Sequence, residues 1–386
     1  MQSAKHKDSC GISRLACEIY PVRYSYAYEN SDVLTINGEV MNKKALLAAA
    51  VAIAVLSTAC GGGGGSSPTP ALAPIPVPVP TPTPTVPAED IQKTVPALTY
   101  PVDSAEFSFV TALNAFRAQV GLGLLAQNAA LDKSAGNHLA YILRNDALLG
   151  GTVDMRAFDP ATGRSNFHIE DSAKPLFTGV QEIDRAKASG YAGQYVGEEI
   201  AFGGGKGSVV GLNSLIAGVY HRAGLMFQGP TDVSVAVGKD ASQTLVMDFG
   251  YGTKTQRNAA DYIGVYPADK QTGVGLHASV EVPNPFPELS LNNDDFPTKT
   301  GYPVSVSAAE GVALKVQEFT LSDAGVVVDS RVMHKDNDPN KLLASNVAFL
   351  VAKARLKAGT QYQVRFVGTA GSAAVNRTWN FTTANN

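Results

Sequence analysis

The chain has 386 residues, of which 45% are hydrophobic and 17% charged, and its formal net charge at pH 7 is −3. This length and apolar content allow a sizeable buried core, and the lack of any basic block argues against nucleic acid as a partner. The charge balance indicates no other partner.

A segment typical of protein export begins forty residues into the chain. Residues 41–60 read "MNKKALLAAAVAIAVLSTAC", with two lysines, an apolar run over 45–56, small residues and then Cys60. Such a run is too short to span a bilayer but suits a signal peptide. The small residue before Cys60 and the glycines after it resemble the lipobox of bacterial lipoproteins, although Ser57 stands where leucine is usual. We therefore predict lipidation at Cys60; a plain signal peptide cleaved near Ala59, or an apolar helix, is the alternative.

Residues 1–40 show neither apolar periodicity nor a second export signal. We predict that they are a mis-called leader and that Met41 is the true start. Of the three cysteines, Cys10 and Cys17 lie in this leader and Cys60 is the proposed lipid anchor. The mature chain would then have no thiol left for a disulfide, and its core alone would stabilise it.

Residues 61–87 form a segment of glycine and serine followed by proline at nearly every second position. Glycine makes a chain flexible, and alternating proline makes it extended polyproline II, so neither part can bury a core. The segment is predicted to be a tether that holds a folded body away from a surface.

The remaining length suggests two domains. In 88–265, apolar residues recur at helical spacing in 106–122, 128–148 and 207–226, with Asn128 as a cap and Gly121 as a stop. Two strands around a polar turn at 239–242 follow. This order predicts a three-layer α-β-α body with an antiparallel sheet.

A proline-rich linker is predicted at 266–288, and an all-β domain at 289–386. The last segment consists of short alternating runs rich in valine, tyrosine, phenylalanine and threonine. Runs at this spacing predict an immunoglobulin-like β-sandwich, with Trp379 in its core. The expected fold class is therefore α+β.

Few residues in the predicted mature chain are typical of catalytic or metal sites. It has five histidines, of which His138, His168 and His221 fall in the first domain close to glutamates in sequence. No HExxH or CxxC motif is present, so spacing alone favours a hydrogen-bonded structural role for any one of them.

Four motifs in order resemble the CAP superfamily of cysteine-rich secretory, antigen 5 and pathogenesis-related-1 proteins, in its bacterial, disulfide-free branch. They are the stretch "ALNAFRAQVGLGLLAQNAALDKSAGNHLAYI", the run "DRAKASGYAGQYVGEEIAFG", the stretch "YHRAGLMFQGPTDVSVAVG" and the strand "TLVMDFGY". The resemblance covers about 105–252 and implies a cleft lined by two histidines and two glutamates.

By motif, three positions of that cleft correspond to His138, Glu198 and His221. Glu170 is our choice for the second glutamate, because it lies between the first histidine and the Gly-Tyr run. Two departures from the family pattern stand out: Glu199 replaces an asparagine, and the tryptophan and serine usual before the second histidine are missing.

Several chemistries fit two imidazoles and two carboxylates. His138 and His221 could hold zinc or another divalent cation, with the carboxylates around it, or a glutamate could act as a general base on water. No serine or cysteine nucleophile accompanies them, so covalent acyl transfer lacks its parts. A polar cluster without any reaction is the remaining interpretation. No cofactor is firmly indicated, and it stays open whether the protein is an enzyme.

The sequence thus predicts a bacterial surface lipoprotein, anchored in the cell envelope or on its outer face through Cys60. Its expected function is to bind an apolar or cell-envelope ligand in the cleft, so that lipid or another envelope component is its partner. One alternative is a metal-assisted hydrolase of envelope polymer or peptide. The other is an adhesion or spacer protein whose sandwich domain does the binding.

Overall fold

The computed structural model describes residues 88–159, 164–203, 209–291 and 294–385, together with the short strands β1 (Cys17–Ile19), β2 (Val33–Ile36) and β3 (Glu39–Asn42). The chain divides into two compact units, one holding Arg23–Thr85 and the other Met1–Val22 with Val86–Asn386. Strands β2 and β3 pair with each other in the first unit. The proposed lipidation site Cys60 and the tether 61–87 lie outside the described residues.

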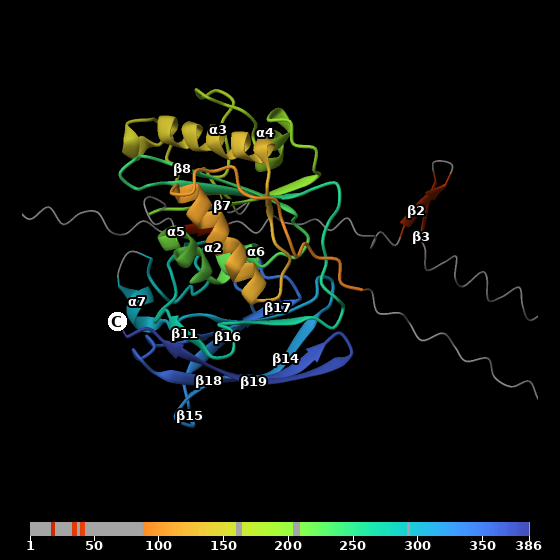
Figure 1. Ribbon diagram of the computed structural model, residues 1–386, viewed down its shortest axis with the longest axis vertical. Helices are drawn as coiled ribbons and strands as arrows, with labels where there is room; N and C mark the ends of the chain where they lie inside the picture. Colours follow the sequence, from red (N-terminus) through yellow and green to blue (C-terminus); the bar gives the residue numbers. More distant parts are fainter. Residues whose placement is uncertain are drawn as a thin grey trace, which may run out of the picture. The chain divides into compact units, whose positions relative to one another are not determined.

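The larger unit contains helices and several sheets, so the predicted α+β class is confirmed (Figure 1). Its first sheet has the order β12-β1-β7-β9-β8-β4, and the three long strands in it, β7, β9 and β8, are antiparallel. The polar turn predicted at 239–242 joins β8 to β9. The bounds of these strands are β4 (Ala126–Gln127), β7 (Tyr195–Ala201), β8 (Asp232–Val237), β9 (Leu245–Tyr251) and β12 (Glu281–Val282).

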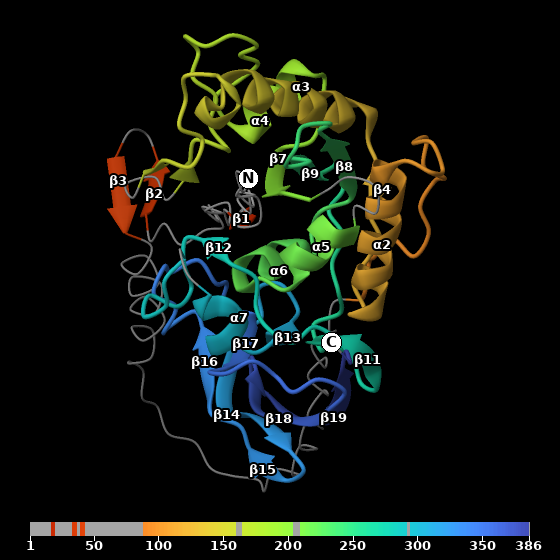
Figure 2. The same cartoon turned by 90° about the vertical axis from the view of Figure 1, so that its left-hand side faces the viewer.

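Helices cover both faces of this sheet, as the two views show (Figure 2). Apolar residues of α3 pack with Ile200 and Val246 on one face, whereas α2, α5 and α6 pack with Met247 and Phe249 on the other. Consecutive residues of a strand point to opposite faces, which explains how β9 serves both. The helices are α2 (Ala105–Gln119), α3 (Ala129–Asn145), η1 (Ala147–Leu149), α4 (Glu182–Ala188), α5 (Val209–Ile216) and α6 (Val219–Leu225).

Local signals fix the ends of the two longest helices. The side chain of Ser104 accepts a hydrogen bond from the backbone of Phe107 at the start of α2, and Asn128 caps α3 in the same way. Gly121, just after α2, has φ of +76°, a backbone conformation that residues other than glycine rarely adopt. The predicted cap and stop therefore lie where the helices begin and end.

The chain then forms two further sheets. The first has the order β10-β13-β17-β16 and the second β11-β19-β18-β14-β15. Burial alternates along β18, and Trp379 is buried with its indole N–H donating to the carbonyl of Pro267. We call these two sheets the strand half and residues 88–258 the helical half. The strands are β10 (Ile263–Tyr266), β11 (Gln271–Val274), β13 (Val304–Ala308), β14 (Leu314–Asp323), β15 (Val326–Val327), β16 (Ser330–His334), β17 (Val347–Ala352), β18 (Gln361–Ala370) and β19 (Ala373–Thr383).

The strand half begins earlier in the chain than predicted, because its first two strands, β10 and β11, lie before residue 289. β10 pairs with β13, and β11 pairs with β19, although both precede residue 289. Between them and β13 the chain returns to the helical half, where the backbone N–H of Ser279 donates to the carbonyl of Ala217. The remaining described elements are the hairpin β5 (Phe158–Asp159) and β6 (Arg164–Ser165) and the short helix α7 (Asp295–Lys299).

The two halves share a buried junction at Arg222. Its guanidinium lies over the rings of Tyr266 and Tyr302, 4.9 and 5.0 Å from their centroids, and donates to the carbonyl of Pro303. A buried cation of this kind needs such acceptors and ring faces to offset its lost hydration. In the described part of the chain, no helix has the length and apolar composition that a membrane span requires.

Candidate functional site

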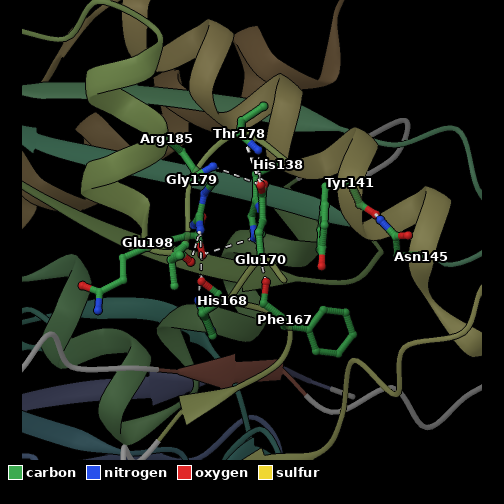
Figure 3. A network of polar contacts seen from close by, with 12 residues as sticks. His138, Tyr141, Asn145, Phe167, His168, Glu170, Thr178, Gly179, Arg185 and Glu198 are labelled. Atoms are coloured by element: carbon green, nitrogen blue, oxygen red, sulfur yellow. Dashed lines mark hydrogen bonds and ion pairs between the residues drawn. The ribbon is translucent and has the colours of Figure 1, made fainter. Parts of the chain in front are cut away.

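A buried network lies between α3 and the sheet, and His138 is its first member (Figure 3). The Nδ1 of His138 is 2.9 Å from a carboxylate oxygen of Glu170, and its Nε2 is 2.7 Å from the carbonyl of Phe167. A carbonyl only accepts, so Nε2 carries a hydrogen, and Nδ1 faces a carboxylate. Both ring nitrogens of His138 therefore have a hydrogen-bond partner inside the network.

Glu170 also orders the loop that follows it. Its carboxylate accepts hydrogen bonds from the backbone N–H groups of Thr178 and Gly179 and from the Thr178 hydroxyl. Three donors besides His138 therefore converge on one carboxylate, which is a strong arrangement for an ionised group. The His138–Glu170 pair thus connects the middle of α3 to the loop before α4.

Glu198 on β7 is the second centre of the network. His168 Nδ1 lies 2.8 Å from its Oε1, and Arg185 Nη2 of α4 lies 2.6 Å from its Oε2. Arg185 Nη1 also donates to the carbonyl of His168, so the three residues hold one another (Figure 3). His138 Nε2 is 3.7 Å from Glu198 Oε1, which links this centre to the first.

These contacts move the pKa values of the network in opposite directions. Burial alone would raise the pKa of Glu198, but the charges of Arg185 and His138 and the hydrogen bond from His168 outweigh it and hold that pKa well below its usual range. Burial lowers the pKa of His168 to about 4, against the effect of Glu198. At neutral pH the network therefore contains an ionised Glu198 and a neutral His168.

Asp248 extends the polar row across the sheet. It is the direct register partner of Glu198 on β7 and of Ser234 on β8, and it is 1% exposed. Burial first, and the charge of Glu198 second, raise the pKa of Asp248 well above its usual range. A carboxyl group in this position favours its protonated, neutral form.

A separate cluster lies on the other face of the sheet, around His221 in α6. The Nδ1 of His221 is 3.1 Å from Glu281 Oε2, and its Nε2 is 3.9 Å from Glu199 Oε2. Glu281 also accepts from the backbone N–H groups of Val219 and Tyr220, so it satisfies the free donors at the start of α6. Burial, then the charges of Glu281 and Glu198, raise the pKa of Glu199 well above its usual range.

The Glu199 side chain fills the space beside Gly224 of α6. A Cβ atom built on Gly224 of α6 would lie 2.1 Å from Glu199 Oε1. Glu199 packs against this helix and is 1% exposed.

The structure brings together three of the four residues predicted for the cleft: His138, Glu170 and Glu198. It does not bring His221 to them, because Glu198 and Glu199 are consecutive on β7 and each contacts the histidine on its own face of the sheet. His168 and Arg185 belong to the network and were not among the chosen residues. His168 could have been found from the sequence, because it stands two residues before Glu170 in "NFHIEDS".

The arrangement does not fit a zinc ion shared by His138 and His221. The two side chains lie on opposite faces of the sheet, and both ring nitrogens of His138 already have hydrogen-bond partners. Among the residues that the structure describes, no three His, Cys, Asp or Glu side chains are placed to hold a metal ion. His138, His168, Glu170 and Glu198 are each at most 2% exposed, so solvent does not reach them.

No protein-family model and no curated protein matches this sequence. Among solved structures, one similar chain is an extracellular protein containing an SCP domain from Bacillus anthracis strain Ames. The two are 19% identical, with a TM-score of 0.29, over 38% of this chain and 40% of the other. The chain thus spans less than half the length of that structure, and a likeness at this level does not establish a shared fold.

Proposed function

We propose that this chain is a lipid-anchored CAP-like protein outside the cytoplasm, which binds an apolar or cell-envelope ligand and catalyses no reaction on it. The observation that supports the absence of a reaction is that the ionisable side chains of the His/Glu network are buried and hydrogen-bonded to one another. A general acid or base must reach the proton that it transfers, directly or through one water.

Glu198 illustrates why hydrolysis is not the favoured function. It would be the natural general base of the network, but its two carboxylate oxygens already accept from His168 and Arg185. Its low pKa also makes it a weak base, because a catalytic base works best with a pKa close to the working pH. In this proposal the network stabilises the packing of α3 and α4 on the sheet, and the ligand contacts other residues.

The proposed location depends on the order of segments at the start of the chain. A basic, apolar and small-residue segment precedes Cys60, and a proline-rich tether follows it before the body begins near Ala88. A tether after a lipidated cysteine lets a folded body work at a distance from its membrane. In the proposal, translation starts at Met41 and the mature protein begins at Cys60, so the mature sheet lacks β1, the strand that pairs with both β7 and β12.

Two measurements test the proposal. The intact mass of protein from the membrane fraction should show diacylglycerol on Cys60, and Cys60→Ala should remove both the lipid and the membrane association. Mass spectrometry of the purified protein should also find a non-covalent apolar or envelope ligand. A peptide from residues 1–40 recovered from cells, or an unlipidated product cut after Ala59, would contradict the proposed location.

The binding role has its own decisive control. Purified protein should not hydrolyse envelope polymer or peptide, and Glu198→Gln should leave the ligand bound provided that the variant is folded. Hydrolysis by the natural protein that Glu198→Gln abolishes, with an unchanged circular dichroism spectrum, would replace the binding proposal by the hydrolase alternative.

A further inference from the structure

Two segments between α3 and α4 expose an unusual number of large apolar side chains. In η1, Leu148 is 69% exposed, and in the loop before α4, Leu176 is 53% exposed. Isolated exposed leucines are ordinary, but a group on adjoining segments marks a contact surface. We call this group the apolar tip; it consists of Leu148, Leu149, Leu176, Phe177 and Val180.

Hydrogen bonds hold the two segments of the apolar tip next to each other. The side chain of Asn145, at the end of α3, donates to the carbonyl of Pro175 at 2.9 Å, and Lys174 Nζ donates to Thr152 Oγ1 at 3.0 Å. In both views the chain between α3 and α4 lies at the end of this unit away from β15 (Figures 1 and 2).

The exposure of the second segment is built into its backbone. Leu176 has φ of +64°, a left-handed conformation that is strained for a branched side chain. The next residues are fixed by the hydrogen bonds from Thr178 and Gly179 to Glu170. Strain held in place by a buried carboxylate is typical of segments that are ordered in advance for a contact.

We infer that the apolar tip inserts into the surface of the lipid bilayer to which the chain is anchored. The inference rests on the proposed function only for the presence of that membrane. The tip offers leucine, phenylalanine and valine with no polar ends, whereas strong protein–protein contacts are enriched in tryptophan, tyrosine and arginine. Apolar groups of this kind suit a membrane interface, and the charges next to the tip in the chain are mixed in sign: Arg144 and Lys174 against Asp171 and Asp146, of which Asp146 pairs with Arg156.

The chain outside the described residues is long enough for this contact. A chain of the length of residues 61–87 can span at most roughly 80 Å, at about 3 Å per residue, against an expected radius of gyration of roughly 19 Å for a body of about 300 residues. An anchor at Cys60 therefore allows the body to turn its apolar tip toward the same bilayer. A second, weaker membrane contact of this kind fixes orientation rather than attachment.

The test places an environment-sensitive dye on the tip of the full-length protein. Cys60 is the only cysteine of the predicted mature chain, and lipidation consumes its thiol, so Leu148→Cys and Phe177→Cys can each be labelled alone. Val327→Cys on β15 is the matched control, because Val327 is an apolar residue of similar exposure, 64%. The probe is a vesicle of phosphatidylethanolamine and phosphatidylglycerol.

On vesicles, the dye at 148 and 177 should brighten severalfold and shift to shorter wavelength, and brominated lipids should quench it, while the dye at 327 stays unchanged. Equal responses at all three positions in vesicle-bound protein would overturn the inference. So would a shift at 148 that grows with protein concentration without vesicles, which would indicate a second copy as the partner. Failure to bind vesicles at all would instead contradict the anchor at Cys60.

A variant at the strained residue separates membrane contact from a structural role. Leu176→Gly removes both the left-handed strain and one apolar side chain. It should raise the melting temperature and at the same time weaken the dye response at 148 severalfold. An undiminished response at 148 would show that Leu176 is not part of the contact and would contradict the tip as defined.

Discussion

Glu198 and Glu199 are neighbours on β7, yet each belongs to a different buried network on its own face of the sheet. Glu198 accepts from Arg185 and His168, whereas Glu199 lies 3.9 Å from His221 and has no arginine of its own among the described contacts. Their pKa values consequently move in opposite directions from a common starting value. The same substitution at the two positions should therefore have opposite effects on stability.

Glu198→Gln should destabilise the fold strongly. It removes the charge that pairs with the buried Arg185, and breaking one side of a buried ion pair costs about 3–5 kcal/mol. Urea unfolding near neutral pH measures the loss. Glu318→Gln is the control, because its pair with Arg365 is at the surface and should contribute no more than about 1 kcal/mol. Equal losses in the two variants would show that the Glu198 pair is not stabilising.

Glu199→Gln should make the protein no less stable at neutral pH, and more stable than the natural chain at higher pH. A carboxyl group whose folded pKa is raised stabilises fully below its unfolded pKa of about 4.3, and that stability is lost as pH rises through the folded value. Glutamine removes this loss. Unfolding free energies of the two proteins across that range should diverge as pH rises; convergence would contradict the prediction.

His168 should make the fold sensitive to mild acid. Its folded pKa of about 4 lies below the usual 6.5, so the unfolded chain takes up a proton first and stability falls as pH drops between these values. The difference corresponds to roughly 3 kcal/mol. His168→Asn, which keeps a donor toward Glu198, should flatten the dependence between about pH 6.5 and about pH 4. A dependence equally steep in the variant would assign the acid sensitivity to other groups.

The start of the second domain can be tested with two fragments. A fragment from Asp261 contains β10 and β11, which pair with β13 and β19, whereas a fragment from Leu289 lacks both. We expect the longer fragment to unfold cooperatively and at a higher urea concentration. The fluorescence of Trp379 reports the transition, since its indole donates to Pro267, which only the longer fragment contains. Identical midpoints would restore Leu289 as the boundary.

Much of the fold follows from local sequence signals. The caps at Ser104 and Asn128, the stop at Gly121 and the turn between β8 and β9 depend on neighbouring residues, which the sequence displays directly. β10 and β11 are only four residues long and pair with strands far along the chain. Such short runs carry little periodicity, so a proline-rich stretch resembled a linker instead.

The candidate site was predictable to a smaller extent. The motifs named His138, Glu198 and His221, and Glu170 was chosen for its place between the first histidine and the Gly-Tyr run; of these, His138, Glu170 and Glu198 do meet on one face of the sheet. Motif order could not assign His221 to a face, since a shift of one residue between Glu198 and Glu199 reverses the direction of the side chain. Glu281 lies in the predicted linker, where nothing in the sequence marks it as the partner of His221.

The path of the chain between the two halves limits how this protein can have been assembled and how it can be taken apart. The chain enters the strand half at β10, returns to the helical half at Ser279 and Glu281, and enters the strand half again at β13. Exchange of one half through a single recombination point would either divide a sheet of the strand half or separate α6 from Glu281, which accepts hydrogen bonds at the start of that helix. For the same reason, one protease cut in 283–303 would leave β10 and β11 of the strand half attached to the helical half, so the nicked protein should stay in one piece until it is denatured.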